Sequence, residues 1–396
     1  MTRKKAVALV VIAASLGALV VGCGSSGDTN IAANGPTSAG GTSGGNCAGS
    51  SCAGTGGAGP AGGTGAVGGT TAGSGSGGTV GGSAGAATGG AGSGAVGAGG
   101  GGGGAAGAWT ATPEIIADSE ADPQGIAVDA DTIYWTTAGV AFGGGAVRKR
   151  AKAGGPVTTI ANSQTSPSSI AVDRSTIYWL SVGSGTDGAV MSLSKMGGSP
   201  TALLTNLKQP WTMVLDDTYV YVSEGECGPI SRVPKLGGAA EPITTSVCDA
   251  RSLMVTPTKV YWVGDGVQVS TLPSGSPMAL VPATAMGERG TLNGTDIFWT
   301  QVIGTTGSVN RLSITDGSET TIVPGEPQPT AVGADANWVY WVTAGAPTAF
   351  RAAPRAGGAP ITVMPLASNS LDFVVDVDAI YLAEEGPPGR IWRIHQ

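Results

Sequence analysis

The feature that most constrains the fold is a short phrase that recurs along residues 109–396. Each copy has an apolar stretch, a polar turn that usually opens with Asp, and then a β-branched residue followed by an aromatic one. A period near 40 residues, built from short β-branched and aromatic runs, is typical of a β-propeller. The aromatic positions are spaced by 37 to 44 residues and are Tyr134, Tyr178, Tyr221, Tyr261, Phe298, Tyr340 and Tyr381.

Each repeat is predicted to contain four strands, because its apolar runs are short and bounded by Gly, Pro, Asp and Ser. In the first repeat the inner strand is expected at 126–128 and the second at 133–135. The third is expected at 147–150, and the outer strand at 156–160. The Gly154-Gly155 pair between the last two supplies the positive φ that a tight hairpin needs.

The two ends of the repeat region predict a closed ring. The seventh repeat stops after its third strand, at 390–394, and a lone strand at 113–117 precedes the first repeat. Pairing these two segments would complete the last blade and remove an open sheet edge. We therefore expect an all-β fold, a seven-bladed β-propeller of four-stranded antiparallel blades over residues 109–396.

The inner strands and the phrases Ile133-Tyr134-Trp135 and Ile177-Tyr178-Trp179 resemble the YWTD propellers of the low-density-lipoprotein-receptor class B type, and more loosely NHL-type repeats. The resemblance covers about 290 residues and implies the propeller fold. The sequence departs from the family because Thr136-Thr137 and Leu180-Ser181 replace the Thr-Asp that follows Tyr-Trp. The family also has six blades, whereas seven repeats are present here, so the resemblance implies no receptor function.

The N-terminus reads as a secretory signal, with Arg3-Lys4-Lys5 followed by an apolar run from Ala6 to Val21. The last residues, Val20-Val21-Gly22-Cys23, resemble the bacterial lipobox. That resemblance implies a signal peptide at 1–22 and a lipid on Cys23. The residue after Cys23 is Gly24 rather than Asp, which favours the outer membrane. An ordinary cleaved signal and an uncleaved anchor are the alternatives.

Residues 24–108 are predicted to be a flexible tether. They contain 36 glycines, and Asp28 is their only charged residue. Such a segment cannot bury enough apolar surface to offset the entropy of ordering it. Scaling for Gly/Ser linkers gives a mean reach of roughly 50 Å. The layout of lipidated Cys, tether (together 23–108) and propeller resembles surface lipoproteins of predatory soil bacteria such as myxobacteria.

Composition excludes several function classes. His395 is the only histidine, so histidine-based triads and multi-histidine metal sites are excluded. The net charge of −7 gives no electrostatic footprint for nucleic acid. We expect a monomer without a metal or another cofactor.

Asp residues stand five positions before several of the aromatic residues, as in Asp129 with Asp131 nearby and Asp376 with Asp378 nearby. Asp in such turns caps its own turn through side-chain hydrogen bonds, and we favour that interpretation over calcium binding. The Tyr and Trp of each repeat are expected to pack between blades rather than to stack on a ligand.

Variable residues point to a binding face. In a propeller, the loops from fourth to first strands and from second to third strands share one face, and variable loops on a rigid scaffold usually carry binding. The longest irregular insertions of this face are expected at 137–146, 181–188 and 302–308. The position ten before each aromatic residue varies most; its occupants are Gln124, Ser168, Trp211, Arg251, Glu288, Thr330 and Leu371.

Trp211 near Arg251 is a candidate stacking spot for a sugar or a peptide, and Glu288, Arg289 and Gln124 are the other candidate ligand-binding residues. A neutral glycan or a cationic peptide suits the mixed, acid-biased charge of this face. The alternative is that these residues form a solvated rim.

Export implies an oxidising compartment, in which disulfides form. Cys227 follows the second strand of the third repeat, and Cys248 precedes the first strand of the fourth. We therefore expect a disulfide between two loops of the same face at neighbouring blades. Cys47 and Cys52 are expected to pair locally within the tether.

Two functions remain open at this point. The first is a membrane-anchored, non-catalytic binding module for a glycan, a peptide or a partner protein. The second is a lyase-type propeller enzyme that uses carboxylates and Arg without histidine. The single histidine favours the first, and a purely structural role in the cell envelope also remains open.

Overall fold

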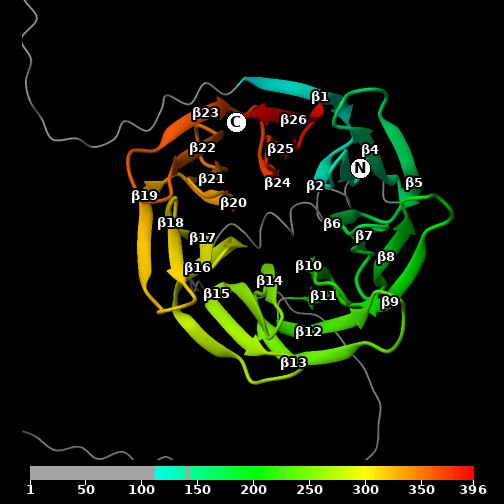
Figure 1. Cartoon of the computed structure of the whole chain (residues 1–396), viewed down its shortest axis with the longest axis horizontal. Coiled ribbons are helices and arrows are strands. Elements are labelled where there is room, and N and C mark those ends of the chain that lie inside the picture. Colours follow the sequence, from blue (N-terminus) through cyan, green and yellow to red (C-terminus); the bar gives the residue numbers. More distant parts are fainter. Residues whose placement is uncertain (1–111, 140–142, 226) are drawn as a thin grey trace, which may run out of the picture. The chain divides into compact units, whose positions relative to one another are not determined.

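The computed structural model describes residues 112–139, 143–225 and 227–396, and the regular elements in this part of the chain are β-strands arranged in a ring of sheets (Figure 1). No helix within these ranges is long and apolar enough to cross a membrane. The segments predicted to be a signal peptide and a tether lie outside the described residues, as do Cys23, Cys47 and Cys52.

Five sheets have four antiparallel strands each. The first blade consists of β2 (Pro123–Val128), β3 (Thr132–Thr137), β4 (Gly145–Ala151) and β5 (Thr158–Gln164). The second consists of β6 (Pro167–Val172), β7 (Thr176–Ser181), β8 (Gly188–Ser194) and β9 (Thr201–Leu207). The third consists of β10 (Pro210–Leu215), β11 (Tyr219–Glu224), β12 (Cys227–Pro234) and β13 (Glu241–Cys248). The fourth such blade is β20 (Pro329–Ala334), β21 (Trp338–Thr343), β22 (Ala349–Pro354) and β23 (Ile361–Pro365).

The fifth four-stranded blade joins the two ends of the described chain. Its order is β1 (Pro113–Glu120), β26 (Gly389–His395), β25 (Ala379–Glu384) and β24 (Ser370–Val375). β1 runs antiparallel to β26, with Pro113 opposite Ile394 and Glu120 opposite Gly389. The predicted pairing of the N-terminal outer strand with the last blade is therefore confirmed.

The predicted count of seven four-stranded blades is wrong. The described residues form five four-stranded blades and one six-stranded sheet, which consists of β14 (Ser252–Thr256), β15 (Lys259–Thr271), β16 (Met278–Asn293), β17 (Asp296–Ile303), β18 (Thr306–Ser313) and β19 (Glu319–Glu326). The fourth and fifth repeats share this sheet instead of forming two separate blades.

The physical reason is that these two repeats have the shortest spacing, 37 residues between Tyr261 and Phe298, which leaves little chain for loops. β15 bends instead of stopping: its first half pairs with β14 and its second half with β16, where Val267 is opposite Val281. A glycine is needed at the bend, because a Cβ on Gly264 would lie 1.6 Å from the Asp249 carbonyl oxygen.

The core lies between neighbouring blades. Trp135, Trp179 and Trp341 are fully buried, and Tyr134 packs with Ile170 and Trp179 of the next blade. This arrangement confirms that the repeated aromatic residues pack between blades. The Gly-Gly hairpins are confirmed as well, since Gly154 and Gly155 have φ values of 102° and 108°.

The repeated Asp residues cap turns and also join blades. Oδ1 of Asp129 accepts hydrogen bonds from the backbone N–H groups of Asp131 and Thr132, at 3.0 and 2.8 Å. Oδ2 accepts from the Tyr134 hydroxyl at 3.0 Å and from Nζ of Lys195, in the next blade, at 2.6 Å. The turn-capping interpretation is confirmed, and the described residues hold no group of three or more His, Cys, Asp or Glu placed to bind a metal ion.

Candidate functional site

The inner strands β2, β6, β10, β14, β20 and β24 surround the axis of the ring (Figure 1). We call the face with the fourth-to-first and second-to-third connections the loop face, and the opposite face the turn face. The inner strands begin at the loop face, so the variable position ten before each aromatic residue lies there. Three of the predicted site residues, Trp211, Arg251 and Glu288, are in contact on this face, and we call their group the mouth.

Arg251 links the other two. Its guanidinium carbon lies 5.6 Å from the centre of the Trp211 ring, and its Nη1 donates to Oε2 of Glu288 at 3.1 Å. Nη2 is 3.4 Å from Oδ1 of Asp249, a residue that the sequence analysis did not single out. Arg251 and Glu288 are both 8% exposed, so this ion pair is largely shielded from water. Trp211 is half-buried.

The buried carboxylate of Glu288 is only partly stabilised by its neighbours. Burial raises the pKa of Glu288, while the positive charges of Arg251 and Arg289 act in the opposite direction. Its Oε1 is buried without a hydrogen-bond partner among the described residues. Because buried polar atoms in folded proteins are usually paired, this oxygen is available to a water molecule or a ligand.

Two further polar atoms near the starts of inner strands share this property. Oγ of Ser168, in β6, and Oδ1 of Asn369, immediately before β24, are buried without a partner among the residues described. Together with Oε1 of Glu288 they give the loop face acceptors that the surrounding chain leaves unused.

Arg289 connects the mouth to an acidic residue of the last blade. Its Nη1 donates to the Arg251 carbonyl at 3.0 Å. Burial raises the pKa of Asp372 to about 6, although the hydrogen bond from the Ile126 N–H and the positive charge of Arg289 act in the opposite direction. Oδ2 of Asp372 accepts from the Ile126 N–H at 3.0 Å, which ties the last blade to the first.

Gln124 belongs to a separate group beside Glu385. Burial, with the Asp122 charge, raises the pKa of Glu385 to about 7, and a hydrogen bond from Gln124 acts in the opposite direction. The structure thus places Gln124 with an acidic pair rather than with the Trp211–Arg251–Glu288 group.

The disulfide between Cys227 and Cys248 is confirmed, but its placement differs from the expectation. The two residues are cross-strand partners in β12 and β13 of one blade, with Cα atoms 3.9 Å apart, rather than members of neighbouring blades. The reason is that β13 extends to Cys248 itself, which leaves no loop before the cysteine. Asp249 and Arg251 follow directly, so the cross-link fixes the chain that enters the mouth.

The predicted insertions have different structures. Residues 182–187 connect β7 to β8, with Oδ1 of Asp187 accepting from the Ser184 N–H at 2.5 Å. The expected irregular insertion at 302–308 is instead a regular hairpin, because Val302 pairs with Gly307 and the chain turns at Gly304, with φ 65°. Part of the third insertion, 140–142, lies outside the described residues.

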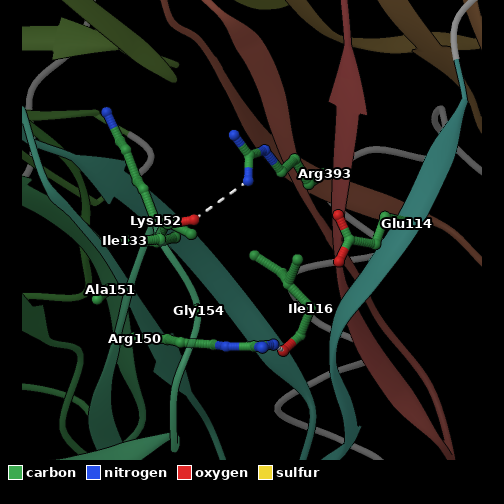
Figure 2. A pocket seen from close by; sticks show the side chains of 9 residues that line it. Glu114, Ile116, Ile133, Arg150, Ala151, Lys152, Gly154 and Arg393 are labelled. Atoms are coloured by element: carbon green, nitrogen blue, oxygen red, sulfur yellow. Dashed lines mark hydrogen bonds between the residues drawn. The ribbon is translucent and has the colours of Figure 1, made fainter.

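The turn face holds a small cleft of about 80 Å³. Figure 2 shows the lining residues, which come from β1, β3, β4, β26 and the turn after β4. Sequence reasoning missed this cleft because Arg150 and Arg393 are far apart in the chain and meet only when the ring closes.

No protein-family model and no curated protein matches this chain. Solved structures do match. The WD40 β-propeller domain of Doa1 is 10% identical over 71% of this chain and 96% of its own, with a TM-score of 0.55. The computationally designed protein Ika8 is 10% identical over 70% of this chain and 98% of its own, with a TM-score of 0.50.

A nidogen/laminin complex matches at 14% identity over 57% of this chain and 89% of that chain, with a TM-score of 0.44. At these identities the likeness to the Doa1 domain and to Ika8 concerns the fold alone, because one propeller architecture carries many functions. The described chain is therefore a β-propeller.

Proposed function

We propose that the protein is an exported lipoprotein, attached to the outer membrane through a lipid on Cys23, that displays its propeller as a non-catalytic binding module. The binding site is the loop-face mouth around Trp211, Arg251 and Glu288. Its ligand is a glycan, a peptide or a partner protein.

The observation that carries this proposal is the contact chain from Trp211 in β10, through Arg251 just before β14, to Glu288 in β16. A half-buried indole ring held in place by a buried ion pair offers an apolar surface that loses little entropy on binding. The unpartnered Oε1 of Glu288 adds a hydrogen-bond acceptor to the same contact chain.

The position of the one histidine supports a non-catalytic role. His395 ends β26 at the turn face, where its Nε2 lies 3.7 Å from Oε2 of Glu114. It therefore lies at the opposite end of the propeller from the mouth. At the mouth, Oε2 of Glu288 accepts a hydrogen bond from Arg251, and Oδ2 of Asp372 accepts one from the Ile126 N–H group. Both carboxylates therefore have structural partners.

The experiment is to probe glycan and peptide arrays with the full chain, and then to compare variants on each hit. We expect Trp211→Ala to weaken binding by about tenfold or more, because aromatic anchors carry much of the energy of an interface. Leu236→Ala is the matched control, since Leu236 is fully exposed in a turn-face hairpin. Binding that survives Trp211→Ala but is lost in Leu236→Ala would place the ligand on the other face.

A further inference from the structure

The turn-face cleft lies at the seam where the ring closes (Figure 2). One wall comes from β1 and β26 of the last blade, and the other from β3, β4 and the following turn of the first blade. Its charged residues are Arg150, Lys152, Arg393 and Glu114. Lys152 pairs with Asp376, so two arginines against Glu114 leave the site locally positive in a chain whose net charge is −7.

The two guanidinium groups are held in place without being neutralised. Nη1 of Arg150 donates to the Ile116 carbonyl, and Nη1 of Arg393 donates to the Lys152 carbonyl at 3.1 Å. Within the described residues, neither arginine has a carboxylate within ion-pair distance, whereas Lys152 pairs with Asp376. Backbone carbonyls thus orient both guanidinium groups and leave their charge available.

Both arginines also carry an unused donor. Nε of Arg150 and Nε of Arg393 are buried without a hydrogen-bond partner among the described residues. An unpaired buried donor is costly, and more so when it belongs to a charged group. An anion that reached either atom would remove that cost.

We propose that this cleft binds a phosphate group. A guanidinium presents a planar fork of donors that matches phosphate and carboxylate oxygens. Two guanidinium groups, contributed by two blades, require acceptor oxygens that point in several directions. A tetrahedral phosphate has them, whereas a carboxylate has only two oxygens. The group comes either from free phosphate or from a lipid headgroup, because the cleft adjoins the start of β1, where residues 1–111 join the propeller.

The test is a phosphate titration of the full chain at neutral pH, with chloride at equal ionic strength as the reference. Thermal unfolding and ³¹P line width are the readouts. We expect a saturable rise of the melting temperature, and an apparent affinity about tenfold weaker or worse in the Arg150→Gln, Arg393→Gln double variant. Arg174→Gln is the matched control, since Arg174 is exposed in a turn of the same face but outside the cleft.

Because both arginines also hold backbone carbonyls, the readout is the change that phosphate causes in each variant relative to its own starting stability. Arg150→Lys, which keeps the charge but loses the fork, is expected to be intermediate. The proposal is overturned if phosphate acts no more strongly than chloride, or if the double variant responds like the wild type.

Vesicles distinguish the two sources. The full chain carrying Cys23→Ala, which leaves no lipid of its own, is sedimented with phosphatidylcholine vesicles with and without phosphatidylglycerol. Binding that requires phosphatidylglycerol and is lost in the double variant assigns the site to a headgroup. Binding of inorganic phosphate without vesicle binding assigns it to a soluble phosphate. The proposal stands independently of the loop-face site, whose test uses different residues.

Discussion

At the residue scale, a single carboxylate connects a turn, a blade core and a neighbouring blade. Asp129 does so through two backbone N–H groups, Tyr134 and Lys195. Asp173 repeats the pattern, with Lys235 of the next blade at 3.1 Å. Asp376 repeats the contact between blades, through its ion pair with Lys152. The same motif therefore fixes the local turn and the spacing of adjacent blades.

We predict that Asp129→Ala lowers the free energy of unfolding by about 2–3 kcal/mol, because several hydrogen bonds lose their acceptor at once. Urea unfolding at neutral pH measures the loss. Asp131→Ala is the matched control: Asp131 is exposed in the same turn and contributes only backbone groups to it. An equal loss in both variants would contradict the assigned role.

The difference in stability between the wild type and Asp129→Ala should depend on pH. Burial alone would raise the pKa of Asp129, but hydrogen bonds from Lys195, the Asp131 N–H and Tyr134 hold it below the usual value. A carboxyl whose folded-state pKa is lowered stabilises the fold above its unfolded pKa, near 4, and loses that contribution as pH falls. The wild type should therefore lose its advantage over Asp129→Ala in acid, and a constant difference would be the contrary result.

Glu385 should show the opposite dependence. Burial, with Asp122, raises the pKa of this carboxyl to about 7, so its charged form costs stability above that pH. We predict that Glu385→Gln raises the melting temperature at pH 8 and has little effect at pH 5, where the native carboxyl is already protonated. Glu319→Gln, at an exposed position of β19, should change neither value. A stabilisation that is equal at both pH values would rule out this interpretation.

At the element scale, the cross-strand disulfide of β12 and β13 holds the strand that leads into the mouth. The bridged residues are separated by 21 positions, for which chain-entropy estimates give roughly 3 kcal/mol. We predict that the Cys227→Ser, Cys248→Ser double variant unfolds at correspondingly lower urea concentration, and that reductant then has no further effect. A wild type whose unfolding is insensitive to reductant would show that the cross-link is not responsible.

The strands could be predicted from the sequence because each carries its own signal: a β-branched run, an aromatic pair, a Gly-Gly turn. The shared sheet of the fourth and fifth repeats could not, because repeat counting assumes a loop wherever a strand changes partner, and Gly264 lets β15 bend instead. Repeat position predicted that Trp211 lies near Arg251 and that Glu288 is on the same face, but not the ion pair of Arg251 with Glu288. The cleft of Arg150 and Arg393 could not be predicted, because it depends on how the ring closes.

At the scale of the whole molecule, ring closure gives the two faces different chemistry. The loop face combines Trp211 with a buried ion pair and unused acceptors. The turn face holds the cationic cleft and the start of β1. Because β1 begins at the turn face, the preceding chain joins the propeller at the end opposite the proposed binding mouth.

The proposed lipid site, Cys23, precedes this entry point in the chain. We predict that the Cys23→Ala form takes up no labelled palmitate and moves from the membrane fraction to the soluble fraction. The reason is that acyl chains provide the attachment, with about 0.8 kcal/mol for each buried CH₂ group. Cys52→Ala is the matched control, a cysteine of the same glycine-rich segment that should leave both labelling and fractionation unchanged. Palmitate that still enters Cys23→Ala, or a wild type that takes up none, would exclude Cys23 as the lipid site.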